Sequence, residues 1–349
     1  MRTTGRLGSV RAAHTRRTFR PIVGLLLAGL LGSLSGCSSR PMEQRSRAAT
    51  NVRGPVEGPS EETLVPFDVR PLLKPPRKYL GVAVDGAPES LAPVRDFAGK
   101  IGKQPNLLEY YVAWGSGFDS QRVRNARAAG ALPLMVWEPF EPSIAEIADG
   151  ASDAYTRKFA RAVRTLNLPL AISFGHEMNG NWYPWGTTAT DPVDYVRAWR
   201  RIHDIFLEVG AANVIWVWSP NNINPVPQVP LKPFYPGDSY IDWIGVVGYY
   251  TDSGASTFPT LFGPTMAVVR KFTHKPILVV ETASQPGPRK RQDVADLFAG
   301  VAASPDVIGF IWFDYVKRAD WRIGNDPSAL AEFKRRAASN LFGFDVKRL

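Results

Sequence analysis

Residues 170–177 read Leu170-Ala171-Ile172-Ser173-Phe174-Gly175-His176-Glu177, a short apolar run that ends in a glycine, a histidine and a glutamate. A run of this length and composition is typical of a strand that is buried on both faces. A second glutamate, Glu281, ends the similar run Ile277-Leu278-Val279-Val280. A carboxylate at the end of a buried strand has lost much of its water, which is costly in a structural role. Both glutamates are therefore candidate catalytic residues.

Six more apolar runs have a similar length and composition, and stretches with helical periodicity lie between most of the eight runs. The expected strands are 80–84, 107–112, 132–137, 170–174, 214–218, 243–249, 277–280 and 307–313. The expected helices are 92–101, 120–129, 155–166, 192–209, 258–272, 292–303 and 329–338. Eight such βα units over about 260 residues predict an α/β fold, a single (β/α)8 TIM barrel that covers residues 77–340.

A doubly wound open sheet is the competing architecture for this order of elements. That fold usually carries a glycine-rich phosphate loop after its first strand. Here the first strand is followed by Asp85-Gly86-Ala87-Pro88, which lacks the glycine pattern. In the barrel, the ends of strands four and seven can face each other across the C-terminal rim, so Glu177 and Glu281 are expected to meet there.

The first 36 residues are expected to be a lipoprotein signal peptide. They contain six Arg and no acidic residue, an apolar run over 22–31, and then Leu34-Ser35-Gly36-Cys37, which resembles a bacterial lipobox. Cys37 is then the lipidated residue, and the protein is exported and anchored to the outer face of the bacterial cell membrane. The alternatives are an uncleaved anchor or an incidental buried cysteine. Thr15-Arg16-Arg17-Thr18-Phe19 also resembles a twin-arginine export signal, so the export route stays open.

Residues 37–76 are rich in Ser, Arg, Glu, Gly and Pro, so we expect a flexible tether before the barrel. The net charge of +10 falls to +4 when the six Arg of residues 1–36 are removed, since 36 basic residues then face 32 acidic ones. That balance gives no indication of a nucleic-acid partner.

The four His, at 14, 176, 203 and 274, lack metal-ligand spacing, and we expect neither a metal nor a cofactor.

Cleavage of a glycosidic bond needs one protonated carboxyl group and one ionised carboxylate. Trp182 and Trp185 place apolar walls beside Glu177, and such walls favour the protonated acid. Glu281 needs a hydrogen-bond donor to stay ionised, and Tyr249, at the end of the neighbouring strand, can supply one. The structural alternative for each glutamate is a buried salt bridge or an ordinary exposed rim position.

The stretch from His176 to Trp185, with Glu281-Thr282-Ala283-Ser284 later in the chain, resembles glycoside hydrolase family 26, which holds β-mannanases and some mixed-linkage β-glucanases. The resemblance covers residues 79–333. It implies that Glu177 is the acid/base and Glu281 the nucleophile of a retaining mechanism. The sugar contacts that it implies or that strand ends suggest are His176, Asn181, Trp182, Tyr249, Trp114 and Trp137, with Trp312 as an aromatic floor under the sugar.

The sequence departs from the family pattern on two strands. On strand four, Ile172-Ser173-Phe174-Gly175 lacks the arginine that relatives often carry before the histidine, and on strand six, Val247-Gly248-Tyr249-Tyr250 lacks the acidic residue that often precedes Gly-Tyr. Asp85, Glu109 and Asp314 lie near strand ends and are either sugar contacts or structural residues, as caps or salt-bridge partners. Together these features predict a lipid-anchored, monomeric, retaining endo-β-glycosidase acting on β-1,4-mannan or a related β-linked polysaccharide. The alternatives are a mixed-linkage β-1,3/1,4-glucanase and a carbohydrate-binding lipoprotein with little turnover.

Overall fold

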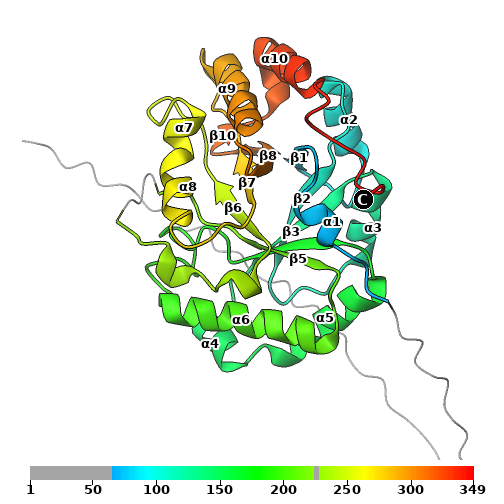
Figure 1. Ribbon diagram of the computed structural model, residues 1–349, viewed down its shortest axis with the longest axis vertical. Helices are drawn as coiled ribbons and strands as arrows, with labels where there is room; N and C mark the ends of the chain where they lie inside the picture. The colour runs from blue at the N-terminus through cyan, green and yellow to red at the C-terminus, as the bar shows by residue number, and fades with distance from the viewer. Residues whose placement is uncertain (1–64, 224–227) are drawn as a thin grey trace, which may run out of the picture. The chain divides into compact units, whose positions relative to one another are not determined.

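The computed structural model describes residues 65–223 and 228–349, and a closed barrel of eight parallel strands forms its centre (Figure 1). The strands follow one another around the barrel in chain order, and β8 closes it by pairing with β1 from Tyr79 beside Gly309 to Val84 beside Asp314. The strands are β1 (Tyr79–Val84), β2 (Leu107–Ala113), β3 (Leu132–Glu138), β4 (Leu170–Phe174), β5 (Val214–Trp218), β6 (Trp243–Val247), β7 (Ile277–Thr282) and β8 (Val307–Asp314). The predicted (β/α)8 architecture is confirmed.

Helices cover the outside of the barrel, as the alternation of apolar runs and helical periodicity predicts (Figure 1). Those that precede or follow the strands are α2 (Ala92–Ile101), α3 (Ser120–Ala128), α4 (Ile144–Asp149), α5 (Asp153–Leu166), α6 (Pro192–Val209), α7 (Phe258–Leu261), α8 (Gly263–Val269), α9 (Lys290–Ala303) and α10 (Pro327–Ala337). Short 3-10 turns are η1 (Lys232–Phe234), η2 (Asp238–Tyr240) and η3 (Ile323–Asn325). Among the residues described, no helix is both long and apolar enough to span a bilayer.

Helix α6 shows how local sequence sets these boundaries. Asp191 caps its first turn by accepting a hydrogen bond from the backbone N–H of Val193 at 2.8 Å, and Pro192 occupies the position where a missing N–H costs nothing. Gly210 ends the helix in the left-handed conformation, at a φ of 78°. Between these limits Trp199, Ile202 and Phe206 lie on the buried face that packs on the barrel.

The barrel domain begins earlier and ends later than the predicted limits of 77 and 340. Residues 1–64, and with them Cys37 and the signal peptide, lie outside the described residues. Part of the expected tether is ordered, because α1 (Arg70–Leu73) buries Leu72 and its carbonyl groups accept hydrogen bonds from the Tyr79 hydroxyl and the Trp243 indole at 2.9 Å each. At the other end, three more apolar side chains are buried: Phe342, Phe344 and Val346.

Two tryptophans that were candidate sugar contacts, Trp114 and Trp137, belong to the core instead. Their ring centres lie 4.2 Å apart, and Trp137 stacks on Phe159 of α5 at 4.4 Å. Trp137 is completely buried and Trp114 is 7% exposed. Alternate side chains of a barrel strand point either into the barrel or toward the helices, and these two occupy the helix side. The expectation that they line a cleft is therefore wrong.

The expected position of Trp312, under the bound sugar at the mouth of the barrel, is also wrong. It is 0% exposed and packs edge-on against Phe333 of α10, with ring centres 5.5 Å apart. It faces the outer layer of helices, so it forms no aromatic floor at the mouth of the barrel. Its neighbour along β8, Phe313, is the side chain that reaches the cavity described below.

Replacing Trp312 with Ala is expected to destabilise the protein and to spare catalysis in the molecules that stay folded. Removing a fully buried tryptophan leaves a cavity that costs about 3–5 kcal/mol. A chemical unfolding curve gives the free energy of unfolding, and kcat per active site on the same preparation gives the catalytic effect. A variant with normal stability and impaired turnover would contradict this structural role and indicate that Trp312 acts in the active site.

Candidate active site

Glu177 and Glu281 line one cavity of about 660 Å³ at the C-terminal rim of the barrel. Glu177 follows β4 and Glu281 lies on β7, so residues 104 positions apart in the sequence reach the same space. The side chains and backbone that line this cavity with them are Trp182, Tyr183, Asn221, Asn222, Gly248, Tyr249, Thr251, Ser253, Gly254, Ala255, Leu261, Phe313, Lys317, Arg318 and Trp321. The predicted meeting of the two glutamates is confirmed.

The backbone at Glu177 adopts an uncommon conformation that aims its side chain into the cavity. Its φ is 55°, in the left-handed region that a glutamate rarely occupies. A hydrogen bond from its N–H to the Ser219 carbonyl, at 2.7 Å, fixes the turn to the end of β5. Backbone strain of this kind persists only where the surrounding structure imposes it, and it gathers at functional sites.

Two side chains hold the carboxyl group of Glu177. The Trp182 indole N–H donates to Oε2 at 3.0 Å, and the Asn221 amide donates to Oε1. Asn221 is itself fixed by Asn179: its N–H donates to Asn179 Oδ1, and the Asn179 amide donates to the Asn221 carbonyl, each at 2.9 Å. This chain of contacts sets the orientation of Glu177 from both β4 and β5.

Two tyrosine hydroxyls hold the carboxylate of Glu281, one on each oxygen. Tyr249 donates to Oε1, as the sequence predicts from its place after β6. Tyr111, on β2, donates to Oε2 and was not foreseen as a site residue. A signal was present, because Glu109 and Tyr111 are polar side chains two positions apart in an otherwise apolar strand, and such a pair faces one side. No arginine forms an ion pair with Glu281 among the described residues.

Removing one of these hydroxyls is expected to weaken turnover and to move the acidic side of the pH profile upward. Tyr249→Phe and Tyr111→Phe each remove a hydrogen bond that lowers the pKa of Glu281, so the ionised nucleophile is lost at higher pH. A hydrogen bond to a charged group contributes about 1.5–3 kcal/mol, so kcat should fall by about tenfold or more. The measurement is kcat against pH.

Tyr240→Phe is the matched control, since its hydroxyl makes no hydrogen bond with the described residues and lies outside the cavity. Equal pH profiles in all three variants would contradict the role assigned to Tyr249 and Tyr111.

Burial raises the pKa of both glutamates, but their hydrogen-bond partners and nearby charges differ. Burial, and then the negative charge of Glu281, raises the pKa of Glu177 to about 7, against the opposing hydrogen bonds from Asn221 and Trp182. Burial also raises the pKa of Glu281, but the Tyr111 and Tyr249 hydrogen bonds and the positive charge of Lys317 oppose it. Glu177 is therefore the group that holds a proton near neutrality, and Glu281 is the group built to be ionised.

Glu109 is a third carboxyl group inside the barrel. It is 2% exposed, and burial, followed by the charges of Glu281 and Glu177, raises its pKa well above the ordinary value. The raised pKa favours the neutral acid, and Glu109 makes no ion pair with the described residues, so the structure does not show the expected salt-bridge role. Asp314 is a structural cap that accepts from the Ile323 N–H at 2.7 Å, and Asp85 is exposed outside the cavity.

Two expected sugar contacts do not line the cavity. The His176 ring is 3% exposed and lies behind Tyr183, with ring centres 4.9 Å apart. Burial lowers the pKa of His176 to about 3, so the ring is neutral and acts as packing for Tyr183. Asn181 is exposed but lies outside the cavity lining. The structure thus brings Trp182 and Tyr249 to the two glutamates, and it leaves His176 and Asn181 outside.

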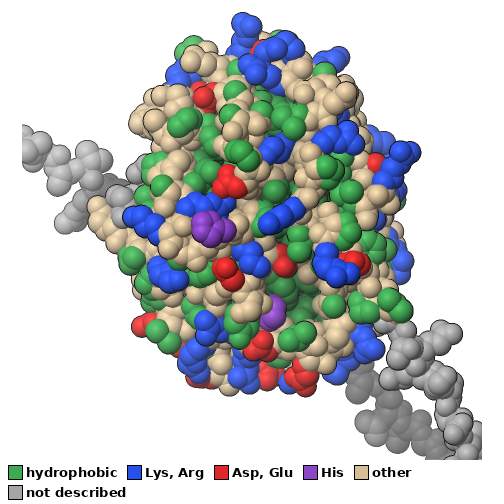
Figure 2. Space-filling view, in the orientation of Figure 1, with side chains coloured by type: hydrophobic (Ala, Val, Ile, Leu, Met, Phe, Trp, Pro, Cys, Tyr) green, Lys and Arg blue, Asp and Glu red, His purple; other side chains and the backbone are tan. Residues whose placement is uncertain are grey.

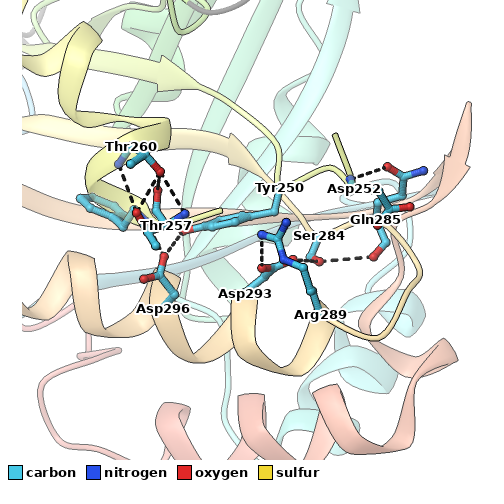
Figure 3. Close-up of polar contacts among 10 residues, drawn as sticks. Tyr250, Asp252, Thr257, Thr260, Ser284, Gln285, Arg289, Asp293 and Asp296 are labelled. Carbon is cyan, nitrogen blue, oxygen red and sulfur yellow. Dashed lines mark hydrogen bonds and ion pairs between the residues drawn. The ribbon is translucent and has the colours of Figure 1, made fainter. Parts of the chain in front are cut away.

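A polar network fixes the loops that follow β6 and β7 (Figure 3). The Tyr250 hydroxyl donates to Asp296 of α9 at 2.9 Å, and the Ser284 hydroxyl donates to Asp293 of the same helix at 2.7 Å. Backbone hydrogen bonds join the loops directly, from Tyr250 to Ala283 at 3.0 Å. Because Tyr249 and Glu281 lie just before these anchored positions, the network holds the tyrosine against the carboxylate.

A paired acid and base in one cavity, with aromatic and amide side chains around them, can cleave a glycosidic bond. No cluster of three or more His, Cys, Asp or Glu side chains suited to a metal occurs within residues 65–223 and 228–349.

The family model of glycosyl hydrolase family 26 matches residues 144–281, a range that includes both glutamates. Endoglucanase H of Acetivibrio thermocellus is 29% identical over 263 residues, which are 71% of this chain and 29% of that protein. A mannan endo-1,4-beta-mannosidase of Bacillus subtilis is 34% identical over 119 residues, 32% of this chain and 29% of that protein. This chain therefore matches less than a third of the length of either relative.

Among solved structures, the catalytic domain of the endo-beta-1,4-mannanase of Bacillus sp. JAMB-750 superposes with a TM-score of 0.62. The identity is 15%, and the match covers 77% of this chain and 88% of that domain. At this identity the likeness concerns the fold alone, and it agrees with the barrel described above.

Proposed function

Because this chain belongs to glycoside hydrolase family 26, we propose that it is a retaining endo-β-glycanase that hydrolyses β-1,4-mannan or a closely related β-linked polysaccharide. The observation that carries this proposal is the pair of glutamates in one cavity, each with its own set of hydrogen-bond donors. Among the residues that the structure describes, no salt bridge neutralises either glutamate, whereas a structural glutamate in this position would need one.

In the proposed double displacement, each residue of the site has one role. Glu177, protonated, donates its proton to the oxygen of the leaving sugar while the Glu281 carboxylate attacks the anomeric carbon. The bond from the anomeric carbon to the leaving oxygen breaks, and a covalent bond to Glu281 forms. Glu177 then accepts a proton from water, which attacks the same carbon and releases Glu281. Tyr111 and Tyr249 orient the nucleophile throughout.

Above pH 7 we expect kcat to fall, because Glu177 must carry a proton to act as the acid. Its pKa is raised to about 7, so the active protonated form is present below that pH and is lost as the pH rises through it. Glu177→Gln should remove this alkaline limb from the residual activity on the polysaccharide, because no group then has to carry the proton. A profile whose alkaline limb survives in Glu177→Gln would assign the limb to another group.

A mixed-linkage β-1,3/1,4-glucan is the second candidate substrate, because the relative that matches over 71% of this chain is named an endoglucanase. A panel of mannan, glucomannan, mixed-linkage glucan, xylan and cellulose, with detection of new reducing ends, separates the two. The proposal requires turnover on at least one β-linked polymer. If the protein bound a polymer but released no reducing ends, the alternative function, a carbohydrate-binding lipoprotein with little turnover, would be supported instead.

We also propose that the protein is exported and held at the cell surface through lipid on Cys37, which lies outside the described residues. The support is the segment 22–31 followed by Leu34-Ser35-Gly36-Cys37. A single acyl chain gives only marginal membrane binding, so stable anchoring requires more than one. Mass spectrometry of the mature N-terminus tests this, and a soluble wild-type protein that begins far beyond Cys37 would refute it.

A further inference from the structure

Two cations line the cavity from a loop that the mechanism does not use. After β8 the chain forms a small hairpin from β9 (Val316–Lys317) and β10 (Ala319–Asp320), with Arg318 at the turn. Lys317 and Arg318 both line the cavity that holds Glu177 and Glu281. On the face drawn in Figure 2, Lys and Arg side chains are spread among apolar, polar and acidic ones.

Both cations lack an acidic partner among the described residues. The acid of the hairpin, Asp320, is already held by Arg322 at 2.7 Å, so it does not neutralise Lys317 or Arg318. Both side chains are exposed to the cavity and to solvent. Two unpaired cations in a confined site are well placed to bind an anion, and an arginine can bind a carboxylate through two parallel hydrogen bonds.

The hairpin is built firmly enough to hold these side chains in place. The Trp321 N–H donates to the Tyr315 carbonyl at 2.9 Å, and its indole N–H donates to the Lys317 carbonyl at 2.8 Å. Arg318 adopts a left-handed φ of 60°, which is uncommon for arginine and turns the chain sharply. Trp321 also packs on Tyr249, with ring centres 4.7 Å apart, so the hairpin is tied to the wall that holds the nucleophile.

The same loop adds an aromatic surface next to the cations. Trp321 lines the cavity beside Lys317 and Arg318, and indole faces are common platforms for sugar rings. Burial raises the pKa of Glu138 on β3 and of Glu177 after β4, and the positive charge of Lys317 opposes this rise at both carboxyl groups. A sugar that stacks on Trp321 would therefore lie within reach of both cations and of the catalytic glutamates.

We propose that the β9–β10 hairpin selects a polysaccharide whose sugars carry a carboxylate, such as uronic acid units, and that Lys317 and Arg318 bind this carboxylate at the catalytic cavity. The inference rests on the proposed glycanase function and narrows its substrate class. A site that contains an ionised Glu281 repels an acidic polymer unless cations offset the repulsion, whereas a neutral mannan needs no such cations.

The test compares two polymers that differ only in charge. A soluble neutral β-mannan, or the glucan that the panel favours, is oxidised at a fraction of its C6 hydroxyls, and half of the product is converted to the methyl ester. The wild-type ratio of kcat/KM, acidic polymer over methyl ester, is expected to be about tenfold, since a charge-assisted hydrogen bond contributes about 1.5–3 kcal/mol. Added salt should lower the ratio.

Lys317→Gln and Arg318→Gln should each bring this ratio close to one, while Lys158→Gln on α5 and Arg124→Gln on α3 should leave it as in the wild type. The control residues are exposed, make no ion pair with the described residues and lie outside the cavity. A wild-type ratio of one or less overturns the inference and leaves the glycanase proposal intact. Equal losses on both polymers in Lys317→Gln also overturn it, because Lys317 then acts on Glu281 alone.

A binding measurement keeps the inference testable if no polymer is hydrolysed. Calorimetric titration of Glu281→Gln with the acidic oligosaccharide and with its methyl ester reports the same preference without turnover. Tighter binding of the acid that disappears in the Lys317→Gln, Glu281→Gln double variant supports the inference even if the glycanase proposal fails. Equal affinity for the two oligosaccharides overturns it.

Discussion

Glu281→Gln is expected to abolish turnover on every substrate, including aryl glycosides with good leaving groups. The amide cannot attack the anomeric carbon, so no covalent intermediate forms, and kcat should fall by about 10⁴-fold or more. The fold should survive, because burial raises the pKa of Glu281 and the ionised carboxylate is itself unfavourable in the folded protein. Steady-state kinetics and a thermal melt on one preparation measure both effects.

Glu208→Gln on α6 is the matched control for this change, since Glu208 is an exposed glutamate in a surface ion pair with Arg157. Surface pairs contribute about 0–1 kcal/mol, so both its kcat and its melting temperature should stay near those of the wild type. A Glu281→Gln variant that keeps more than a few per cent of wild-type turnover would remove Glu281 from the nucleophile role.

Glu177→Gln is expected to separate substrates by their leaving groups. On polysaccharides the loss of the proton donor should reduce kcat by about 10²–10⁴-fold. On aryl glycosides with good leaving groups the first step should survive, because the departing oxygen needs little protonation. The second step then lacks a base, the glycosyl-enzyme accumulates, and a burst of released phenol precedes slow turnover.

Azide should restore the second step in Glu177→Gln, because a small anionic nucleophile needs no base, and a glycosyl azide should form. In the wild type azide should have little effect. A variant that is equally inactive on activated and natural substrates, with no rescue by azide, would contradict the assignment of Glu177 as acid/base.

The barrel and its two glutamates were predictable because the signals are local. Each strand is a continuous apolar run, and the C-terminal ends of the strands in a barrel lie on one rim. The positions of Glu177 and Glu281 at the ends of the fourth and seventh runs therefore predict that they share this rim. The Tyr249 hydrogen bond followed from the adjacency of strands six and seven in the same count.

The orientation of single aromatic side chains was not predictable in the same way. In strands buried on both faces the sequence is apolar throughout, so Trp312 and Phe313 could not be assigned to the helix side or the cavity side by pattern. The contact between Tyr111 and Glu281 could not be predicted for another reason. It joins β2 and β7, which are not adjacent, and only the closed barrel brings the two side chains together.

The position of the hairpin after β8 at the cavity could not be predicted from the sequence either. Its stretch Val316-Lys317-Arg318-Ala319-Asp320 has no periodicity and contains two cations that look like an ordinary solvated surface. Their meaning comes from placement, since the ion pair of Asp320 with Arg322 leaves Lys317 and Arg318 free to line the cavity.

The identity of the residue that forms the covalent bond to the sugar tests the central claim most directly. A 2-deoxy-2-fluoro glycoside with a good leaving group slows both steps but the second more, so the glycosyl-enzyme should accumulate and can be digested and sequenced by mass spectrometry. The account predicts one sugar per molecule, attached to Glu281, and none in Glu281→Gln. A label on any other residue, or complete inactivity toward the probe with products of inverted anomeric configuration on the natural polymer, would contradict it.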